Sequence, residues 1–557
     1  MLSLQYALPA MPQLQTDLMA PLDVLRLYPA HNNTIIDVLR SRTSLQPEKE
    51  LLLFQGQSFT YAQVQAHVQQ AAGVLKAKGV SAGDRVGVMS LNHPTSVFML
   101  LALASLGAVY VPVNPDYGVN EAHYVLSHAQ VCGVVASPSA LATVREAVET
   151  IQPVPWLLLN DHTDAPQAQG LQNLPALMQI ATPFTANAAT PDSTGLFIYT
   201  SGTTGFPKGV MHAQRSLVVA GEGFVARMYL QPDERILCVL PMFHINAIFY
   251  SLSGTLAAGA TLILEPRFSA STFWKTVKET GATEVNTIAA ASAILMRRPR
   301  SEYVPGHALQ KIYGAPFDNE VFRVFNNEFE VPVLIEGYGM SEIPGALNNP
   351  FLGPRKVLCM GPPSQHPDPA VKLADVKVVD DDGNELPNGQ TGELTVRTPI
   401  VMQAYYRDEA QTRAAFRDGW FLTGDLAWKD DDGYFWFVAR KKDIIRKRGE
   451  NISGAELDRV IGNHPAVLEA AAIPVPSDLG EDDILVAVIL QDGKTATPED
   501  IAAWCRQHLA AIKVPRYVVF VASLPHTPTN RIAKFKMRED KSLLANATDL
   551  GSGGRAA

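Results

Sequence analysis

The chain has 557 residues. We therefore expect more than one domain, because single domains usually hold about 100 to 200 residues. Hydrophobic residues make up 47% and charged residues 18%, and the net charge of -9 argues against general nucleic-acid binding. The four cysteines form no CxxC pair, which argues against a disulfide framework and a zinc site. The N-terminal segment shows no secretory pattern, so we expect a reducing, cytoplasmic location.

Helices and strands alternate in the first part of the predicted structure. Thr60 and Gln63 form a capping-box pattern at the start of a helix that ends near Gly79. Further predicted elements are a strand over 85–90, a helix over 97–106 and a strand over 108–113. This alternation indicates a parallel sheet.

One apolar stretch, residues 97–113, is long enough to raise the question of a membrane span. Gly107 divides this stretch and Pro112 ends it. A core helix followed by a core strand is therefore favoured.

A loop rich in glycine and hydroxyl groups follows the apolar strand 196–199. It reads Thr200-Ser201-Gly202-Thr203-Thr204-Gly205-Phe206-Pro207-Lys208-Gly209. Glycine lets backbone N–H groups approach phosphate oxygens, the hydroxyls add donors, and Lys208 supplies a positive charge. The loop is not a Walker A motif, because Gly209 follows Lys208 where Ser or Thr is required. A flexible polar linker is the alternative, but Pro207 and the apolar strand after it favour a shaped polyphosphate-binding loop.

This loop resembles the phosphate-binding signature of the adenylate-forming (AMP-binding) superfamily, which includes acyl-CoA synthetases, adenylation domains of nonribosomal peptide synthetases and firefly luciferase. The resemblance covers about residues 30 to 540. It implies an α/β fold with a large N-terminal adenylation domain (1–439) of parallel and mixed sheets with flanking helices and a small β-subdomain. A small mobile α+β C-terminal domain (440–545) would follow, and we expect a disordered tail over 546–557.

The nucleotide-binding residues are assigned by this resemblance. Tyr338 is a flat ring that stacks on a base, Ser341 is a hydroxyl donor, and Glu342 is a carboxylate suited to Mg²⁺. The implied ATP or AMP site comprises Thr200, Ser201, Gly202, Thr203, Thr204, Gly205, Lys208, Gly314, Ala315, Pro316, Tyr338, Gly339, Ser341, Asp425 and Arg440, with Glu342 as metal ligand.

The acyl pocket begins at His244, after the apolar strand 236–240. A lone histidine here is more often structural, but the resemblance places it at the carboxylate end of the pocket. The implied lining is His244, Ile245, Phe249, Ala290 and Ile343. These segments are mostly apolar or small, which favours a monocarboxylic acid with an uncharged tail over a dicarboxylate.

Basic residues gather around position 446. A bare charge run is often a solvated face, and that alternative stays open here. The resemblance assigns Lys442 as the hinge and places Arg446, Arg448, Gly449, Lys513 and Arg516 near coenzyme A. Two Asp-rich segments, 380–383 and 430–433, are predicted hairpin turns rather than metal sites.

The segment that carries the family's catalytic lysine departs from the usual Gly-Lys-Ile, because Asn530 and Arg531 precede Ile532. Three alternatives follow: Arg531 serves in place of lysine, Lys534 takes the role, or neither matters and adenylation is weak.

The function implied is an ATP-dependent acyl-CoA synthetase that uses ATP, Mg²⁺ and coenzyme A, with Lys208, His244, Glu342 and Arg531 catalytic. Alternatives are an adenylating enzyme serving a carrier-protein thiol, a luciferase-like oxygenase, and a nucleotide-binding module with lapsed catalysis. We expect no nucleic-acid partner and no membrane span, and the sequence leaves room for a homodimer.

Overall fold

The computed structural model describes residues 18–161, 170–200, 207–447, 450–477, 481–526 and 532–551. Contacts divide them into two compact units. Unit 1 holds the described residues of Met1–Thr200, Pro207–Val376 and Val396–Phe421, and unit 2 those of Lys377–Thr395 and Leu422–Ala557. The units do not divide between residues 439 and 440, so that boundary remains a prediction about domain movement.

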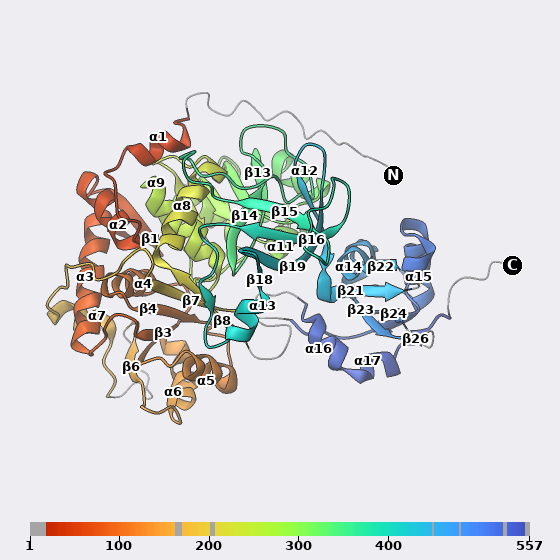
Figure 1. Cartoon of the computed structure of the whole chain (residues 1–557), viewed down its shortest axis with the longest axis horizontal. Helices are drawn as coiled ribbons and strands as arrows, with labels where there is room; N and C mark the ends of the chain where they lie inside the picture. The colour runs from red at the N-terminus through yellow and green to blue at the C-terminus, as the bar shows by residue number, and fades with distance from the viewer. Residues whose placement is uncertain are drawn as a thin grey trace. The chain divides into compact units, whose positions relative to one another are not determined.

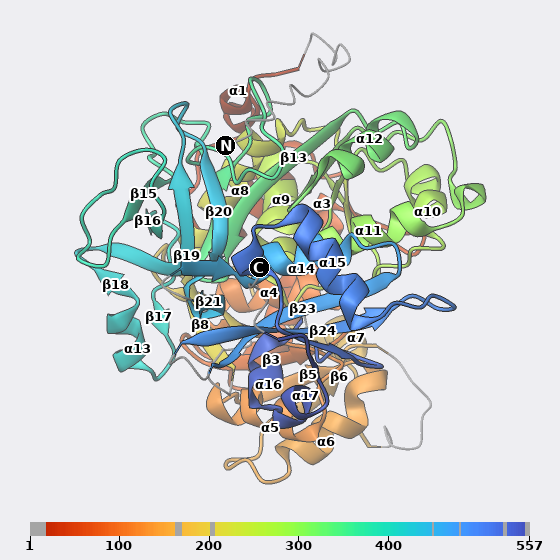
Figure 2. The ribbon, with the colours of Figure 1, turned by 90° about the vertical axis from the view of Figure 1, so that its right-hand side faces the viewer.

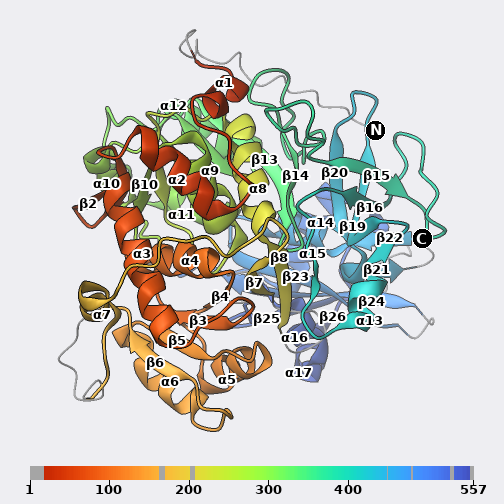
Figure 3. The same ribbon diagram turned by 60° about the vertical axis from the view of Figure 1, so that its left-hand side comes forward.

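A seven-stranded sheet in unit 1 holds the strands that flank the phosphate loop (Figure 1). Alternate strand residues reach opposite faces: Val135 packs with α3 and α4, and Val134 packs with α5 and α6 (Figure 3). In spatial order the strands are β17 (Ala404–Tyr405), β8 (Lys208–Ala213), β7 (Thr194–Thr200), β4 (Val109–Val113), β3 (Arg85–Met89), β5 (Gly133–Ala136) and β6 (Trp156–Leu159). The covering helices are α3 (Tyr61–Ala77), α4 (Pro94–Leu106), α5 (Val119–His128) and α6 (Leu141–Val148).

The predicted capping box forms at the start of α3. The Gln63 backbone N–H donates to Thr60 Oγ1, and the Thr60 N–H donates to Gln63 Oε1 at 2.8 Å. Helix α4 ends at Gly107, whose φ of 69° suits glycine. Among the described helices, none is both long and apolar enough to cross a membrane.

An eight-stranded sheet forms the other half of unit 1. Leu262 faces the core shared with the first sheet, and Ile263 faces α10, α11 and α12. The strands in order are β14 (Ile343–Asn348), β13 (Val333–Met340), β12 (Lys311–Gly314), β11 (Glu284–Asn286), β9 (Arg235–Cys238), β10 (Thr261–Leu264), β1 (Glu50–Phe54) and β2 (Gln57–Thr60). The helical segments are α8 (Gln214–Met228), a π-helix (Asn246–Leu252) and α9 (Ser253–Ala258) in the shared core, and α10 (Phe273–Thr280), α11 (Ala289–Arg297) and α12 (Asn319–Asn327) opposite. Other helices of the unit are α1 (Pro21–Arg26), α2 (Ile35–Leu45), α7 (Leu174–Ile180) and α13 (Glu409–Ala414).

The C-terminal part of unit 2 is a four-stranded sheet with helices on both faces (Figure 2). Val486 packs with α14 and α15, whereas Leu485 packs with α16. Its elements are α14 (Gly454–Gly462), β23 (Val467–Pro476), β24 (Asp482–Leu490), α15 (Pro498–His508), β25 (Tyr517–Phe520), α16 (Lys534–Glu539), α17 (Lys541–Ala545) and β26 (Thr548–Asp549).

Two smaller sheets hold further strands. One contains β15 (Asp375–Val379), β16 (Gly392–Arg397), β18 (Phe416–Arg417), β19 (Trp420–Lys429) and β20 (Phe435–Arg440), and a second pairs β21 (Ile444–Lys447) with β22 (Glu450–Ser453). The Asp-rich segments are turns, with positive φ at Gly383 and Gly433, as predicted. The α/β fold class expected from the sequence is confirmed.

The predicted disorder from residue 546 onward is wrong for residues 546–551. Strand β26 pairs with β25, and Asp549 accepts two hydrogen bonds from Arg516 at 3.0 and 3.1 Å. A bidentate ion pair of this kind orders a short C-terminal segment whose composition alone predicts disorder. Residues 552–557 lie outside the described part of the chain.

Candidate nucleotide and acyl site

Lys208 lies at the start of β8, directly after the phosphate loop. Because β17 pairs with β8, Tyr405 lies opposite Val210 and its ring comes beneath the lysine. The ammonium group is 5.0 Å from the Tyr405 ring centroid and donates a hydrogen bond to Gln411 Oε1. These contacts hold a positive charge where the loop returns to the sheet.

Glu342 approaches the same tyrosine from another part of the chain. It lies in the turn between β13 and β14, is 7% exposed, and accepts a hydrogen bond from the Tyr405 hydroxyl at 2.7 Å. Burial and the adjacent carboxylate raise the pKa of Tyr405, so this hydroxyl stays protonated. Lys208 and Glu342 therefore converge on one side chain within unit 1.

The donor set suits magnesium bound together with a polyphosphate. Among the described residues, no group of three or more His, Cys, Asp or Glu has metal-binding spacing. Mg²⁺ in nucleotide sites is usually held by one or two carboxylates together with substrate phosphates. A single buried carboxylate such as Glu342 fits that arrangement.

His212 links β8 to the turn that carries Ser341 and Glu342. Its Nε2 is 2.6 Å from the Ser341 carbonyl oxygen, which only accepts, so Nε2 carries the proton. Burial lowers the pKa of His212 to about 4, so the ring is neutral at physiological pH. Sequence reasoning identified neither His212 nor Tyr405; a polar residue inside the apolar β8 was the available signal for His212.

The residues expected around the adenine lie on adjacent strands. Gly314 ends β12, where an added Cβ would be 2.9 Å from Thr287 Oγ1 and 2.6 Å from Phe317, so only glycine fits. Glu336 accepts hydrogen bonds from the Phe317 and Leu358 N–H groups, which fixes the loop after Gly314. Burial raises the pKa of Glu336 to about 8.

Tyr338, Gly339 and Ser341 follow along β13 and its turn, and all three are partly exposed. Ala315 and Pro316 continue the loop after Gly314. The structure thus brings these residues onto neighbouring strands, and their contacts with a nucleotide remain predictions.

The predicted acyl-pocket residues come from three elements. His244 and Ile245 lead into the π-helix, where Phe249 is buried and packs its ring 4.9 Å from that of His212. Ala290 lies at the start of α11 and Ile343 at the start of β14. Sequence reasoning did not include Arg227 of α8, which packs against Gly345 and Tyr250. Its signal was a charge on the apolar face of a helix, three residues after Phe224.

Asp425 and Arg440 are partners across the β19–β20 ladder in unit 2. Arg440 Nε lies 3.4 Å from Asp425 Oδ1, and the aspartate is 4% exposed. A carboxylate held in this way can accept hydrogen bonds from two hydroxyls. The proposed ribose role is compatible with this geometry.

Two of the residues expected near coenzyme A form ion pairs within unit 2. Lys513 donates to both Glu456 oxygens at 2.7 and 2.9 Å, and Arg516 pairs with Asp483 at 2.8 Å. Arg446 is exposed on β21. A CoA role for Lys513 or Arg516 would require each to exchange or share its carboxylate partner.

Lys442 is exposed in the 3₁₀ turn Lys441–Asp443. Its neighbour Lys441 pairs with Asp381 and Glu393 at 2.9 and 3.1 Å, which anchors one end of the turn. A hinge role for Lys442 remains a prediction.

Lys534 is 2.5 Å from Asp458 Oδ2, and Asp458 Oδ1 accepts a hydrogen bond from the Ala472 N–H. This pair joins α16 to α14 inside unit 2. Several predicted site residues lie outside the described part of the chain: Ser201, Gly202, Thr203, Thr204, Gly205, Arg448, Gly449 and Arg531.

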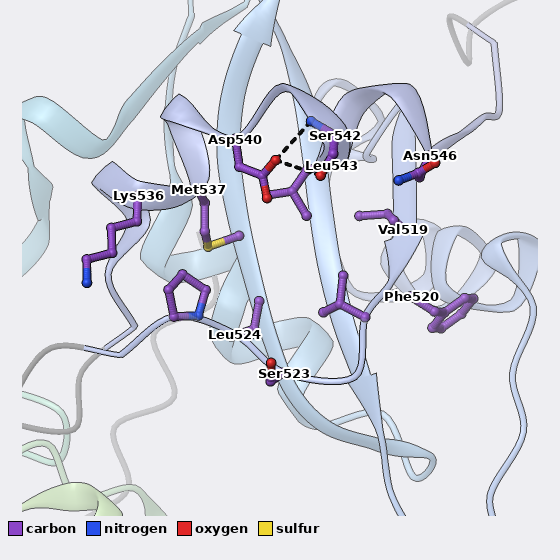
Figure 4. Close-up of a pocket in the computed structure, with 12 residues that line it drawn as sticks. Val519, Phe520, Ser523, Leu524, Lys536, Met537, Asp540, Ser542, Leu543 and Asn546 are labelled. Carbon is purple, nitrogen blue, oxygen red and sulfur yellow. Dashed lines mark hydrogen bonds between the residues drawn. The ribbon is translucent and has the colours of Figure 1, made fainter.

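A pocket in unit 2 lies between α16, α17 and the segment after β25 (Figure 4). Leu524, Met537 and Leu543 supply apolar walls. Asp540 caps α17 by accepting hydrogen bonds from the Ser542 N–H and hydroxyl at 2.9 and 2.6 Å. Because this carboxylate is used structurally, the pocket is not assigned a role in the reaction.

Comparison with known proteins identifies the class. The family model described as AMP-binding enzyme matches residues 39–406, and the model described as AMP-binding enzyme C-terminal domain matches residues 456–531. The chain is 32% identical to a sulfoacetate–CoA ligase of Cupriavidus necator over 92% of this chain and 99% of the relative. It is 30% identical to a crotonobetaine/carnitine–CoA ligase of Proteus mirabilis, over 87% of this chain and 95% of that one.

Among solved structures, ATP-bound MatB from Rhodopseudomonas palustris is similar, with a TM-score of 0.81 and 26% identity. The match covers 91% of this chain and 99% of that one. The protein is thus an enzyme of the acid–thiol ligase class. The chain belongs to the AMP-binding enzyme family.

Proposed function

We propose that this protein is an ATP-dependent acyl-CoA synthetase, which activates a carboxylic acid as acyl-adenylate and then transfers the acyl group to coenzyme A. The convergence of Lys208 and Glu342 on Tyr405 carries the proposal, because a cation and a carboxylate of the kind that binds Mg²⁺ then lie together next to the end of the phosphate loop. The family assignment and the named CoA ligases among the relatives support it.

In the first half-reaction a carboxylate oxygen attacks the α-phosphorus of ATP, and the bond to pyrophosphate breaks. Lys208 stabilises the negative charge that develops on the departing group. Bound Mg²⁺ would neutralise phosphate charge, with Glu342 as its protein ligand. In the second half-reaction the CoA thiol attacks the acyl carbonyl, and AMP leaves with the electron pair of the broken C–O bond.

The chemical nature of the acid's tail is less narrowly specified than the type of reaction. The pocket residues named from the sequence are apolar or small, which fits an uncharged tail. The relatives named above act on chemically unlike acids, so their names do not decide the question. Arg227, in contrast, is a charge placed among the pocket elements of this chain.

Pyrophosphate release from ATP, measured with a panel of carboxylic acids in the presence and absence of coenzyme A, tests the proposal. We expect acid-dependent pyrophosphate release, and thioester and AMP in equal amounts when CoA is added. Nucleotide binding without turnover would favour the lapsed module, and oxygen uptake would favour the luciferase-like alternative. The four free cysteines suit a cytoplasmic location, where we place the reaction.

We also propose that the C-terminal domain rotates about Lys442 between the half-reactions. Proline at 442 restricts φ at that residue. Lys442→Pro should therefore still form acyl-adenylate but lose most thioester formation. Lys442→Ala is the matched control, since it removes the same ammonium and leaves the backbone free. Pyrophosphate release and thioester formation, measured separately, decide the point; equal loss of both in Lys442→Pro would contradict the hinge.

A further inference from the structure

Arg227 of α8 is a buried cation. The residue is 4% exposed, and no carboxylate of the described residues lies within ion-pair distance of it. Other buried cations of unit 1 are compensated. Lys311 pairs with Glu234, and Arg42 donates from all three nitrogens, to two carbonyls of α9 and to Ser41 Oγ. Arg42 also has no carboxylate partner, but of these three cations only Arg227 has a buried nitrogen without a hydrogen-bond acceptor among the described residues.

The hydrogen bonds of Arg227 leave one side of the guanidinium open. Nη2 donates to the Gly345 carbonyl at 2.9 Å, and contacts to Asn348 Oδ1 and Ser364 Oγ are long, at 3.4 Å each. Nη1 is buried and has no hydrogen-bond acceptor among the described residues. The N–H groups of Nη1 thus have no well-aligned acceptor among the described residues.

Aromatic rings surround the guanidinium. The rings of Tyr250, Tyr313 and Phe224 lie 5.0, 5.3 and 5.7 Å from its central carbon. Cation–π contacts of this kind stabilise the charge partly, and the Tyr250 hydroxyl oxygen also accepts a hydrogen bond from the guanidinium. The rings exclude water and so lower the local dielectric constant. This strengthens the electrostatic attraction between the guanidinium and any oxyanion that pairs with it.

The guanidinium lies where the elements of the acyl pocket meet. Helix α8 lies beside β14 (Figure 3). A Cβ at Gly345 would be 2.2 Å from Nη2, so the arginine packs directly on the backbone two residues after Ile343. A Cβ at Gly339 would be 2.5 Å from the Gly345 nitrogen and 3.0 Å from the Tyr250 hydroxyl. The space that a side chain would need at these two glycines is thus filled by the guanidinium, the Gly345 backbone and the Tyr250 hydroxyl, so Arg227 packs closely on β14.

The side chains become more buried from His244, where we expect the substrate carboxylate to react, toward Arg227. His244 and Asn246 are partly exposed, whereas Tyr250, one turn later, is buried with Arg227. A substrate whose carboxylate reacts near His244 would extend its tail inward along the π-helix. The tail would end at the cation.

We propose that Arg227 binds a second oxyanionic group at the far end of the substrate, so that the enzyme selects acids with two anionic ends. A carboxylate and a sulfonate share the required chemistry, since each presents two oxygens to the Nη1 side of the guanidinium. The inference rests on the proposed acyl-CoA synthetase function. It replaces the uncharged tail expected from the sequence, because that expectation considered only segments that lack Arg227.

The test compares acids of equal length that differ only in the charge of the tail. Succinate and glutarate are paired with their monoamides, and 3-sulfopropionate with its sulfonamide, in the pyrophosphate-release assay. Wild-type enzyme should prefer each dianion over its neutral partner by about 10²-fold in kcat/KM. The carboxylate and sulfonate pairs show which oxyanion fits better.

Arg227→Met removes the charge at similar length and should lower that preference by about 10²-fold, while Arg227→Lys should keep part of it. Arg42→Met is the matched control, a buried arginine outside the pocket, and should lower the melting temperature without changing the preference. A wild-type preference for the neutral partners would overturn the inference, whether or not the variants fold. So would equal losses toward dianionic and neutral acids in Arg227→Met.

The two proposals fail in different ways. Pyrophosphate release with neutral acids alone would leave the synthetase function intact and contradict the anion subsite. Absence of release with every acid tested would contradict the function itself, and the subsite with it.

Discussion

Replacing Lys208 with alanine should slow acyl-adenylate formation on the order of 10²-fold or more, because it removes a charge aimed at the leaving pyrophosphate. Glu342→Gln should have a similar effect, since it keeps an oxygen acceptor for the Tyr405 hydroxyl and removes the charge that binds Mg²⁺. Pyrophosphate release at saturating acid measures both.

Two control variants separate catalysis from packing. Gln411→Ala removes the neutral partner of Lys208 and keeps the ammonium, so we expect a much smaller loss. Tyr405→Phe removes the hydroxyl that holds Glu342, and we expect it to raise the Mg²⁺ concentration needed for half-maximal activity. Near-normal pyrophosphate release from both Lys208→Ala and Glu342→Gln would show that the site is elsewhere.

The sequence predicted those helix ends and turns that depend on interactions between residues close together in the chain. The capping box at Thr60 and Gln63 fixes where α3 begins through bonds between neighbours, and Gly107 fixes where α4 ends. The two Asp-rich turns were readable for the same reason, because each needs a glycine with positive φ. Such features need no knowledge of the tertiary fold.

Partners that are far apart in sequence were not predictable in this way. Tyr405 reaches Lys208 only because β17 pairs with β8. The residues around Tyr405 give no sequence signal that predicts this pairing. Arg227 could be noticed as a charge on an apolar helix face, but its orphaned Nη1 is visible only once β14 and the π-helix surround it. The ordered residues 546–551 likewise depend on Arg516, a partner remote in the sequence.

The resemblance leaves Lys534, the nearest lysine to Arg531, as an alternative for the catalytic lysine. The structure places its ammonium on Asp458, with the lysine side chain 12% and the aspartate side chain 24% exposed. Burial raises the pKa of Asp458 and Lys534 opposes that rise, so each group depends on the other.

Arg531→Ala should therefore cripple adenylation and spare thioester formation from pre-made acyl-adenylate, because a guanidinium can hold both the carboxylate and the α-phosphate. Lys534→Ala should instead lower stability by about 3 kcal/mol, since it leaves Asp458 uncompensated, and should impair both half-reactions alike.

The double variant Asp458→Asn with Lys534→Met distinguishes the two roles. Asparagine keeps an oxygen for the Ala472 N–H, and removing both charges should restore most of the melting temperature and of both half-reactions. If Lys534→Ala instead keeps the wild-type melting temperature and loses adenylation alone, while Arg531→Ala stays active, the catalytic role belongs to Lys534. The pairing with Asp458 favours Arg531, because a lysine paired with a partly buried carboxylate must first break that pair before it can reach a substrate.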